Sequence, residues 1–152
     1  MIVVLLLHSW LRWLVVLALA GRTGLAGVRL AQGAPFEKID RATSGITMGL
    51  VHTEILIGLL MYGLSPLVRV AMSDMGAAMK DPTLRFFAVE HSTIMVIAAV
   101  VVTAAMVFAR RAADDRRRHL ITLVGFGLTL LLVVAMIPWP FRGFGRAWFM
   151  IP

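Results

Sequence analysis

The sequence lacks cysteine altogether and carries little charge. The absence of cysteine from its 152 residues excludes disulfide-stapled folds, thiolate-ligated zinc, iron–sulfur clusters, thiol catalysis and covalently attached c-type haem. Only 15% of the residues are charged, whereas soluble domains have about a quarter. In contrast, 60% are hydrophobic and the mean hydropathy is +0.89. This composition excludes a disordered chain and indicates a membrane protein.

Four apolar runs are each close to the length of about 20 residues that a bilayer core requires. They cover residues 2–20, 46–67, 86–108 and 120–137. The connections between them are short, and a helix satisfies its own backbone hydrogen bonds in lipid. We therefore expect a single all-α domain over residues 1–152, with four transmembrane helices in an up-down-up-down bundle.

The chain has an excess of positive charge, with 15 Lys and Arg against 8 Asp and Glu. These basic residues lie mainly between the apolar runs, and the sequence has no basic face or aromatic stacking platform of the kind that binds nucleic acid. We expect them to set the topology and to contact anionic membrane lipids. We expect no nucleic-acid partner.

The two membrane surfaces differ in positive charge. We call the side that holds the N-terminus side A and the opposite side B. Side A carries five basic residues: Arg69, Lys80, Arg85, Arg142 and Arg146. Side B carries nine: Arg22, Arg29, Lys38, Arg41, Arg110, Arg111, Arg116, Arg117 and Arg118. By the positive-inside rule, we expect side B in the cytoplasm and both termini on the opposite side of the membrane.

Three connecting segments have recognisable local signals. Residues 67–79 mix apolar and charged side chains, which is typical of a helix lying in the membrane interface. Asp81 and Pro82 have the pattern of an N-cap followed by proline at the first helical position. Residues 110–118 are expected to form a solvated helix extension. Trp139 and Trp148 follow the fourth run and are expected to be interfacial anchors. Pro138 and Pro140 are expected to end the fourth helix.

Ionisable side chains inside the apolar runs are costly in lipid, so each is a candidate functional residue. The four histidines are distributed one to each predicted helix. The candidates are His8, Arg12, His52, Glu54, Glu90, His91 and His119.

His8 and His91 are predicted to lie at the same depth. His8 is six residues beyond Ile2 and His91 is five beyond Phe86, both counted from side A. At 1.5 Å per residue, their depths agree within roughly 2 Å. In a bundle whose sequential helices are neighbours, the first and third helices are diagonal. We therefore predict that these two imidazoles are the axial ligands of a haem iron, a coordination that suits electron transfer.

His52 and His119 form a poorer pair on the second and fourth helices. Their depths, counted from side B, differ by about 10 Å, although shifted span boundaries would reduce the offset. Two haems, or one haem at His8 and His91 with the other histidines structural, both remain open. Small residues near these histidines provide either room for a porphyrin or close helix packing. They are Gly45, Gly49, Gly125 and Gly127.

Arg12 lies one turn deeper than His8 and on the same helix face. It is interpreted either as the counter-charge of a haem propionate or semiquinone, or as the ion-pair partner of Glu54 or Glu90. The ion pair is favoured because buried carboxylates need partners. Neither carboxylate shares a helix face with the histidine next to it, which disfavours a Glu-x-x-His dimetal site. A proton-relay role for either one stays open.

Nearly the whole chain resembles a group of small bacterial four-helix membrane proteins described as cytochrome b-like. The resemblance is carried by residues 7–13, 52–62, 79–91 and 137–142, above all by Leu-His-Ser at 7–9, Val-Glu-His at 89–91 and Ile-Pro-Trp-Pro at 137–140. It implies an integral membrane protein with b-type haem in a respiratory membrane. Carried over to this chain, the family pattern places its histidines at His8, His52, His91 and His119.

We expect an electron-transfer protein rather than a stand-alone enzyme. The hypothesis is a b-type cytochrome with one or two haems, belonging to a larger membrane redox complex and exchanging electrons with quinone or quinol. One alternative is a cofactor-free accessory subunit that braces such a complex. Another is a small transporter or sensor that binds metal ions through histidine and glutamate.

Overall fold

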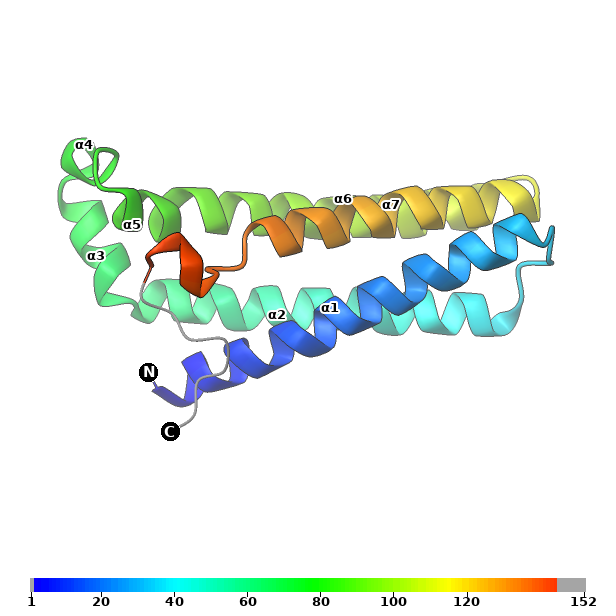
Figure 1. Cartoon of the computed structure of the whole chain (residues 1–152), viewed down its shortest axis with the longest axis horizontal. Coiled ribbons are helices and arrows are strands. Elements are labelled where there is room, and N and C mark those ends of the chain that lie inside the picture. The colour runs from blue at the N-terminus through cyan, green and yellow to red at the C-terminus, as the bar shows by residue number, and fades with distance from the viewer. Residues whose placement is uncertain (1, 145–152) are drawn as a thin grey trace.

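The computed structural model describes residues 2–144 and consists of four long helices with short helices at one end (Figure 1). Within this range every regular element is helical, and no β-strand is present. The predicted contributions of Arg146, Trp148 and the C-terminus lie outside the described residues. The long helices are α1 (Ile2–Ala31), α2 (Lys38–Leu64), α6 (His91–Arg111) and α7 (Asp115–Ala135).

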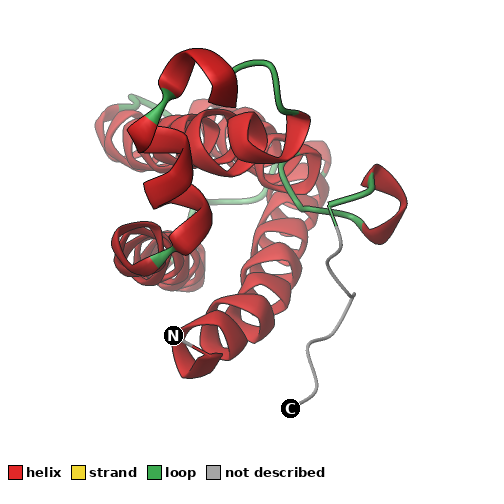
Figure 2. Ribbon diagram, turned by 90° about the vertical axis from the view of Figure 1, so that its left-hand side faces the viewer, coloured by secondary structure: helices red, strands yellow, loops and turns green. Residues whose placement is uncertain are grey.

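The four long helices form a closed ring in the order α1, α2, α6, α7. Each packs against the next one along the chain, and α7 returns to pack against α1. Helices α1 and α6 therefore lie on one diagonal, and α2 and α7 on the other (Figure 2). The all-α four-helix bundle predicted from the apolar runs is confirmed.

The helices are longer than the predicted spans, mainly on side B. Helix α1 continues to Ala31 and α2 begins at Lys38, whereas the apolar runs stop at 20 and start at 46. On side A the second run was predicted to reach residue 67, but α2 ends at Leu64. The reason is local, because Ser65 accepts a hydrogen bond from the Val68 amide and caps a new helix.

The side-B segment 110–118 is a helix end, a short turn and a new helix start rather than one extension. Helix α6 ends at Arg111, and α7 begins at Asp115. The side chain of Asp114 accepts a hydrogen bond from the Arg117 amide at 2.8 Å, so it is the N-cap of α7. This short turn brings α6 and α7 together as antiparallel neighbours.

Short helices cover the side-A end of the bundle. The predicted interfacial helix is split in two, because Asp74 accepts a hydrogen bond from the Ala77 amide and starts a separate helix. The N-cap predicted at Asp81 is confirmed, since its carboxylate accepts from the amides of residues 83 and 84. These elements are α3 (Pro66–Ser73), α4 (Met75–Ala78), α5 (Pro82–Arg85), the π-helix η1 (Phe86–Glu90) and the 3-10 helix η2 (Pro140–Arg142).

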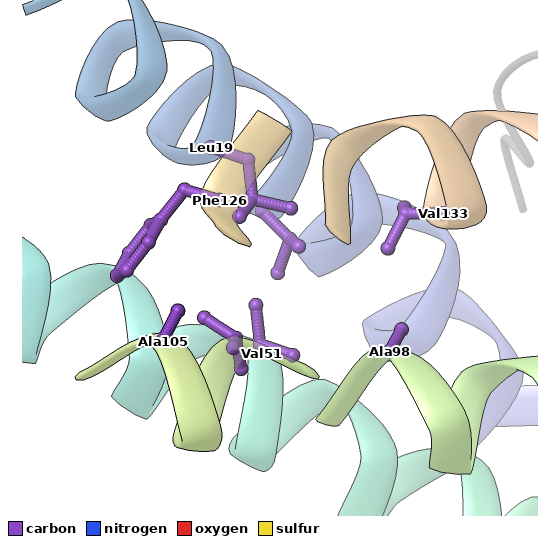
Figure 3. Packing of buried hydrophobic residues seen from close by; sticks show 8 residues of the cluster. Leu19, Val51, Ala98, Ala105, Phe126 and Val133 are labelled. Carbon is purple, nitrogen blue, oxygen red and sulfur yellow. The ribbon is translucent and has the colours of Figure 1, made fainter. Parts of the chain in front are cut away.

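The hydrophobic core lies between all four long helices, as Figure 3 shows. Its buried residues are Val15, Leu19, Val51, Ala98, Val102, Ala105, Phe126 and Val133. The outer faces are also apolar: Leu17, Leu56 and Leu131 are each more than 60% exposed. Helices that are apolar on every side are typical of membrane spans. All four are long and apolar enough to cross a membrane.

Gly125 allows α7 to lie against α6, and its replacement is expected to separate them. A Cβ atom at this position would overlap the Cβ of Ala105. Gly125→Ala should therefore destabilise the protein by about 1–3 kcal/mol, measured by denaturant unfolding in detergent. Gly49 is the matched control, because a Cβ there meets nothing within 4 Å. Gly49→Ala should be neutral or stabilising by up to about 1 kcal/mol, and equal losses from both variants would contradict the packing role.

Candidate functional site

His8 and His91 face each other across the α1–α6 diagonal. Their ring centroids are 6.3 Å apart, and the ring planes meet at 84°. Both side chains line one cleft between the side-A halves of the long helices. The two histidines matched by depth in the sequence are thus brought together in space.

His91 is oriented by the end of helix α7. Its Nδ1 lies 2.9 Å from the backbone carbonyl oxygen of Met136. Because a carbonyl only accepts hydrogen bonds, Nδ1 must carry the proton, and in the neutral ring Nε2 retains its lone pair. Metal-binding histidines are commonly oriented in this way.

A π-helix immediately precedes His91 and sets the rotation of α6. Segment η1 widens the helix over Phe86–Glu90, and the hydroxyls of Tyr62 and Ser92 both donate to the carbonyl of Ala88 within it. Such local widening is frequent at functional sites. The sequence pattern of residues 86–90 did not predict a π-helix.

His8 is paired with the carboxylate of Glu54 on α2. The His8 Nδ1 lies 3.1 Å from Glu54 Oε1, and the two side chains are 14% and 11% exposed. The contact is electrostatic, because the geometry of the two groups is not that of a hydrogen bond. Gly58, one turn further along α2, brings the backbone close to the His8 ring, because a Cβ there would lie 3.3 Å from Cε1.

Arg12 belongs to the same group of charges. It interacts electrostatically with Glu54 and with His91, and its side chain also lines the cleft. Of the two carboxylates predicted as partners of Arg12, Glu54 is the one whose charge acts on it, and the ion pair itself stays a prediction. Glu90 is engaged elsewhere, with its carboxylate 2.6 Å from Nε of Arg85. The sequence placed Glu54 at the depth of Arg12 but did not reveal its contact with His8.

The Ile-Pro-Trp-Pro segment closes the end of α7 beside the site. The indole of Trp139 donates to the carbonyl of Val134 at 3.0 Å, and the guanidinium of Arg142 donates to that of Ala135 at 3.0 Å. Together with His91, which uses the Met136 carbonyl, they satisfy three successive carbonyls at the helix terminus. The segment thus holds in place the Met136 carbonyl, which orients the ring of His91. Trp139 was in addition predicted to anchor the helix at the membrane interface.

The structure does not bring His52 and His119 together. Nε2 of His52 lies 3.0 Å from the hydroxyl of Thr103, which connects α2 to the neighbouring helix α6. His119 is buried near the side-B end, and its ring centroid lies 5.0 Å from that of Phe36. Of the glycines near these histidines, Gly125 and Gly127 lie close to neighbouring helices, and a Cβ at Gly127 would lie 3.4 Å from Thr23. A Cβ at Gly49 would meet nothing within 4 Å.

Known proteins do not assign a function to this site. No family model, curated protein or solved structure matches the chain. The assignment therefore depends on the chemistry of the side chains around the cleft.

The separation of the His8 and His91 rings is compatible with two imidazoles on one metal ion. Two imidazoles bound to one metal ion at about 2.0 Å each have ring centroids roughly 6–7 Å apart, as observed for His8 and His91. Among the described residues, no group of three or more ligating side chains comes together.

The cleft that holds this pair is small and partly open. Its volume is about 130 Å³, below the roughly 300–1,000 Å³ of pockets that enclose whole ligands. Because of this small volume, the cleft would have to widen on side A to hold a complete macrocycle. Helix α1, which forms one wall of the cleft, runs obliquely to the other three long helices (Figure 1).

Proposed function

We propose that the protein is a membrane electron carrier that holds one b-type haem between His8 and His91. The observation that carries this proposal is the meeting of two imidazoles, from diagonal helices, at a separation suited to one iron. Coordination by two histidines leaves no open position on the metal, which favours electron transfer over reaction with a substrate.

The surrounding residues hold the two imidazoles in place. The Met136 carbonyl orients the ring of His91, and the Glu54 carboxylate orients the ring of His8. Such partners of ligating histidines typically contribute 10–100-fold to metal affinity, as an order of magnitude. When bound, the haem supplies one-electron reduction and oxidation. Arg12 supplies a positive charge beside Glu54, which keeps the fixed charge of the cleft balanced.

The site suits partners that reach it through the membrane. Quinone or quinol dissolves in the same phase as the helices, and the cleft is partly open. The described chain consists of a helical bundle with short connections, so a larger redox complex would supply the soluble electron partner. The charge asymmetry supports an orientation with side B in the cytoplasm. The resemblance to small bacterial membrane proteins supports the bacterial inner membrane, which would place both termini in the periplasm.

One haem agrees with the arrangement of the histidines better than two. His52 contacts Thr103 and His119 contacts Phe36, so these rings do not form a second facing pair. We therefore do not assign them as haem ligands within this proposal.

The test is a reduced-minus-oxidised absorption spectrum of the purified protein together with its iron content. We expect a b-type spectrum with one haem per chain. Both His52→Ala and His119→Ala should retain at least about half of that haem content, because neither ring faces the proposed iron position. A folded, iron-free, colourless protein would overturn the proposal, and complete haem loss in either variant would overturn the ligand assignment.

The small volume of the cleft favours a second candidate function, a cofactor-free subunit that braces a membrane redox complex. In that case His8, Glu54 and Arg12 would form an interhelical polar cluster. Copurification with large redox subunits, combined with a colourless isolated chain, would distinguish it from the electron carrier. Metal analysis would at the same time test the small transporter hypothesis.

A further inference from the structure

A second cavity lies at the opposite end of the bundle, between the α1–α2 connection and the start of α7. Its volume is about 210 Å³. Its wall includes two arginines, one aspartate and one histidine, together with the backbone of the connection. The lining residues are Arg29, Leu30, Gly33, Ala34, Pro35, Asp115, Arg116 and His119.

His119 is buried in the wall of this cavity. Its side chain is among the largest fully buried ones, with 1% relative exposure. Neither ring nitrogen has a hydrogen-bond partner among the described residues. An unsatisfied buried donor or acceptor is costly, so such a group usually has a partner outside the protein chain.

The charges around the cavity are unevenly compensated. Arg29 is neutralised by Glu37 at 2.9 Å and by Asp40 at 3.2 Å. Asp115 is paired with Arg118 at 2.9 Å. The neighbouring carboxylates pair with Arg117 and Arg118, so the exposed Arg116 has no ion pair within residues 2–144 and its charge at the cavity wall is balanced by no carboxylate there.

The surface that contains the cavity is strongly basic. The side-B segments contain nine basic residues and four acidic ones (Glu37, Asp40, Asp114 and Asp115), which leaves a net charge of 9 − 4 = +5. Basic pockets at membrane surfaces favour anionic lipid headgroups. The cavity is also at the helix ends, where a phosphate group of a lipid would lie.

We propose that this cavity binds a phosphate group, supplied by an anionic phospholipid or by free phosphate. Arg116 provides a charged guanidinium and His119 a ring N–H, and the phosphate oxygens accept both. This site is separate from the His8–His91 cleft and does not depend on the electron-carrier function.

The experiment measures lipid binding to the full-length protein in neutral detergent by native mass spectrometry. Phosphatidylglycerol is titrated against phosphatidylcholine of the same acyl chains, and inorganic phosphate is added as a competitor. We expect saturable binding of one phosphatidylglycerol and none of phosphatidylcholine. Arg116→Gln should weaken binding about tenfold, because it removes a charge-assisted hydrogen bond.

Arg110→Gln is the matched control, because it removes the same charge at the exposed side-B end of α6, away from the cavity. It should change the affinity less than about twofold. His119→Gln, with helicity checked by circular dichroism, should also weaken binding. If millimolar inorganic phosphate displaces phosphatidylglycerol, the cavity also binds free phosphate.

Two results would overturn the proposal. Equal losses in Arg116→Gln and Arg110→Gln would show that only general surface charge attracts the lipid. The absence of saturable binding by both phosphatidylglycerol and phosphate would show that the cavity is not an anion site.

Discussion

His8→Ala and His91→Ala are each expected to reduce the haem content of the purified protein to less than about a tenth of the wild-type value. In the proposed electron carrier, each substitution would remove one of the two imidazoles that hold the iron, leaving a single ligand. The measurement is the reduced-minus-oxidised spectrum, normalised to protein and combined with iron analysis. His52→Ala is the matched control, since it removes an imidazole of the same bundle that contacts Thr103.

Chemical rescue separates loss of a ligand from loss of the fold. Free imidazole can occupy the space left by the His8 side chain, and should restore a six-coordinate b-type spectrum to His8→Ala reconstituted with haem. The helical content of both variants should match that of the wild type. Full haem content in both variants would show that His8 and His91 are not the ligands.

Asp40→Ala is expected to lower the free energy of unfolding by about 3–5 kcal/mol, because it leaves a buried charge unpaired. The side chains of Asp40 and Arg22 are both 0% exposed, and Asp40 Oδ1 lies 3.6 Å from Arg22 Nη2. The second carboxylate oxygen contacts Arg29 at 3.2 Å and accepts from the Glu37 amide at 3.0 Å. Denaturant unfolding in detergent, followed by circular dichroism, measures the change.

Two variants control for this effect. Arg117→Ala removes one partner of an exposed ion pair with Asp114 and should be nearly neutral, because such pairs contribute little. The double variant Arg22→Met/Asp40→Leu removes both buried charges and should recover a large part of the loss. If Asp40→Ala were no more destabilising than Arg117→Ala, the buried pair would not stabilise the contact between α1 and α2.

The sequence alone determined the class of fold and the depth of the principal histidines. Four apolar runs were sufficient to predict four membrane-spanning helices, because lipid leaves the backbone few alternatives. The constant rise of an α-helix placed His8 and His91 at one depth, and the short connections placed their helices on a diagonal. The two rings consequently meet as predicted.

The sequence predicted the helix boundaries and the buried ion pairs less completely. Capping signals located Asp81 correctly, whereas the caps at Ser65 and Asp114 were missed because each lies inside or beside a longer predicted helix. The buried pair of Arg22 and Asp40 was also missed. Arg22 was assigned to a surface segment, although α1 continues as a helix past it to Ala31.

Only the tertiary structure decided which polar side chains meet. The rise per residue determines depth, but the rotation of each helix about its own axis is set by packing, and in α6 by the π-helix before His91. That rotation directs His52 to Thr103, brings Glu54 to His8 and leaves His119 in the wall of a separate cavity. The rotation follows from how the helices pack against one another, as at Gly125 against Ala105, and such contacts between distant residues have no local signal in the sequence.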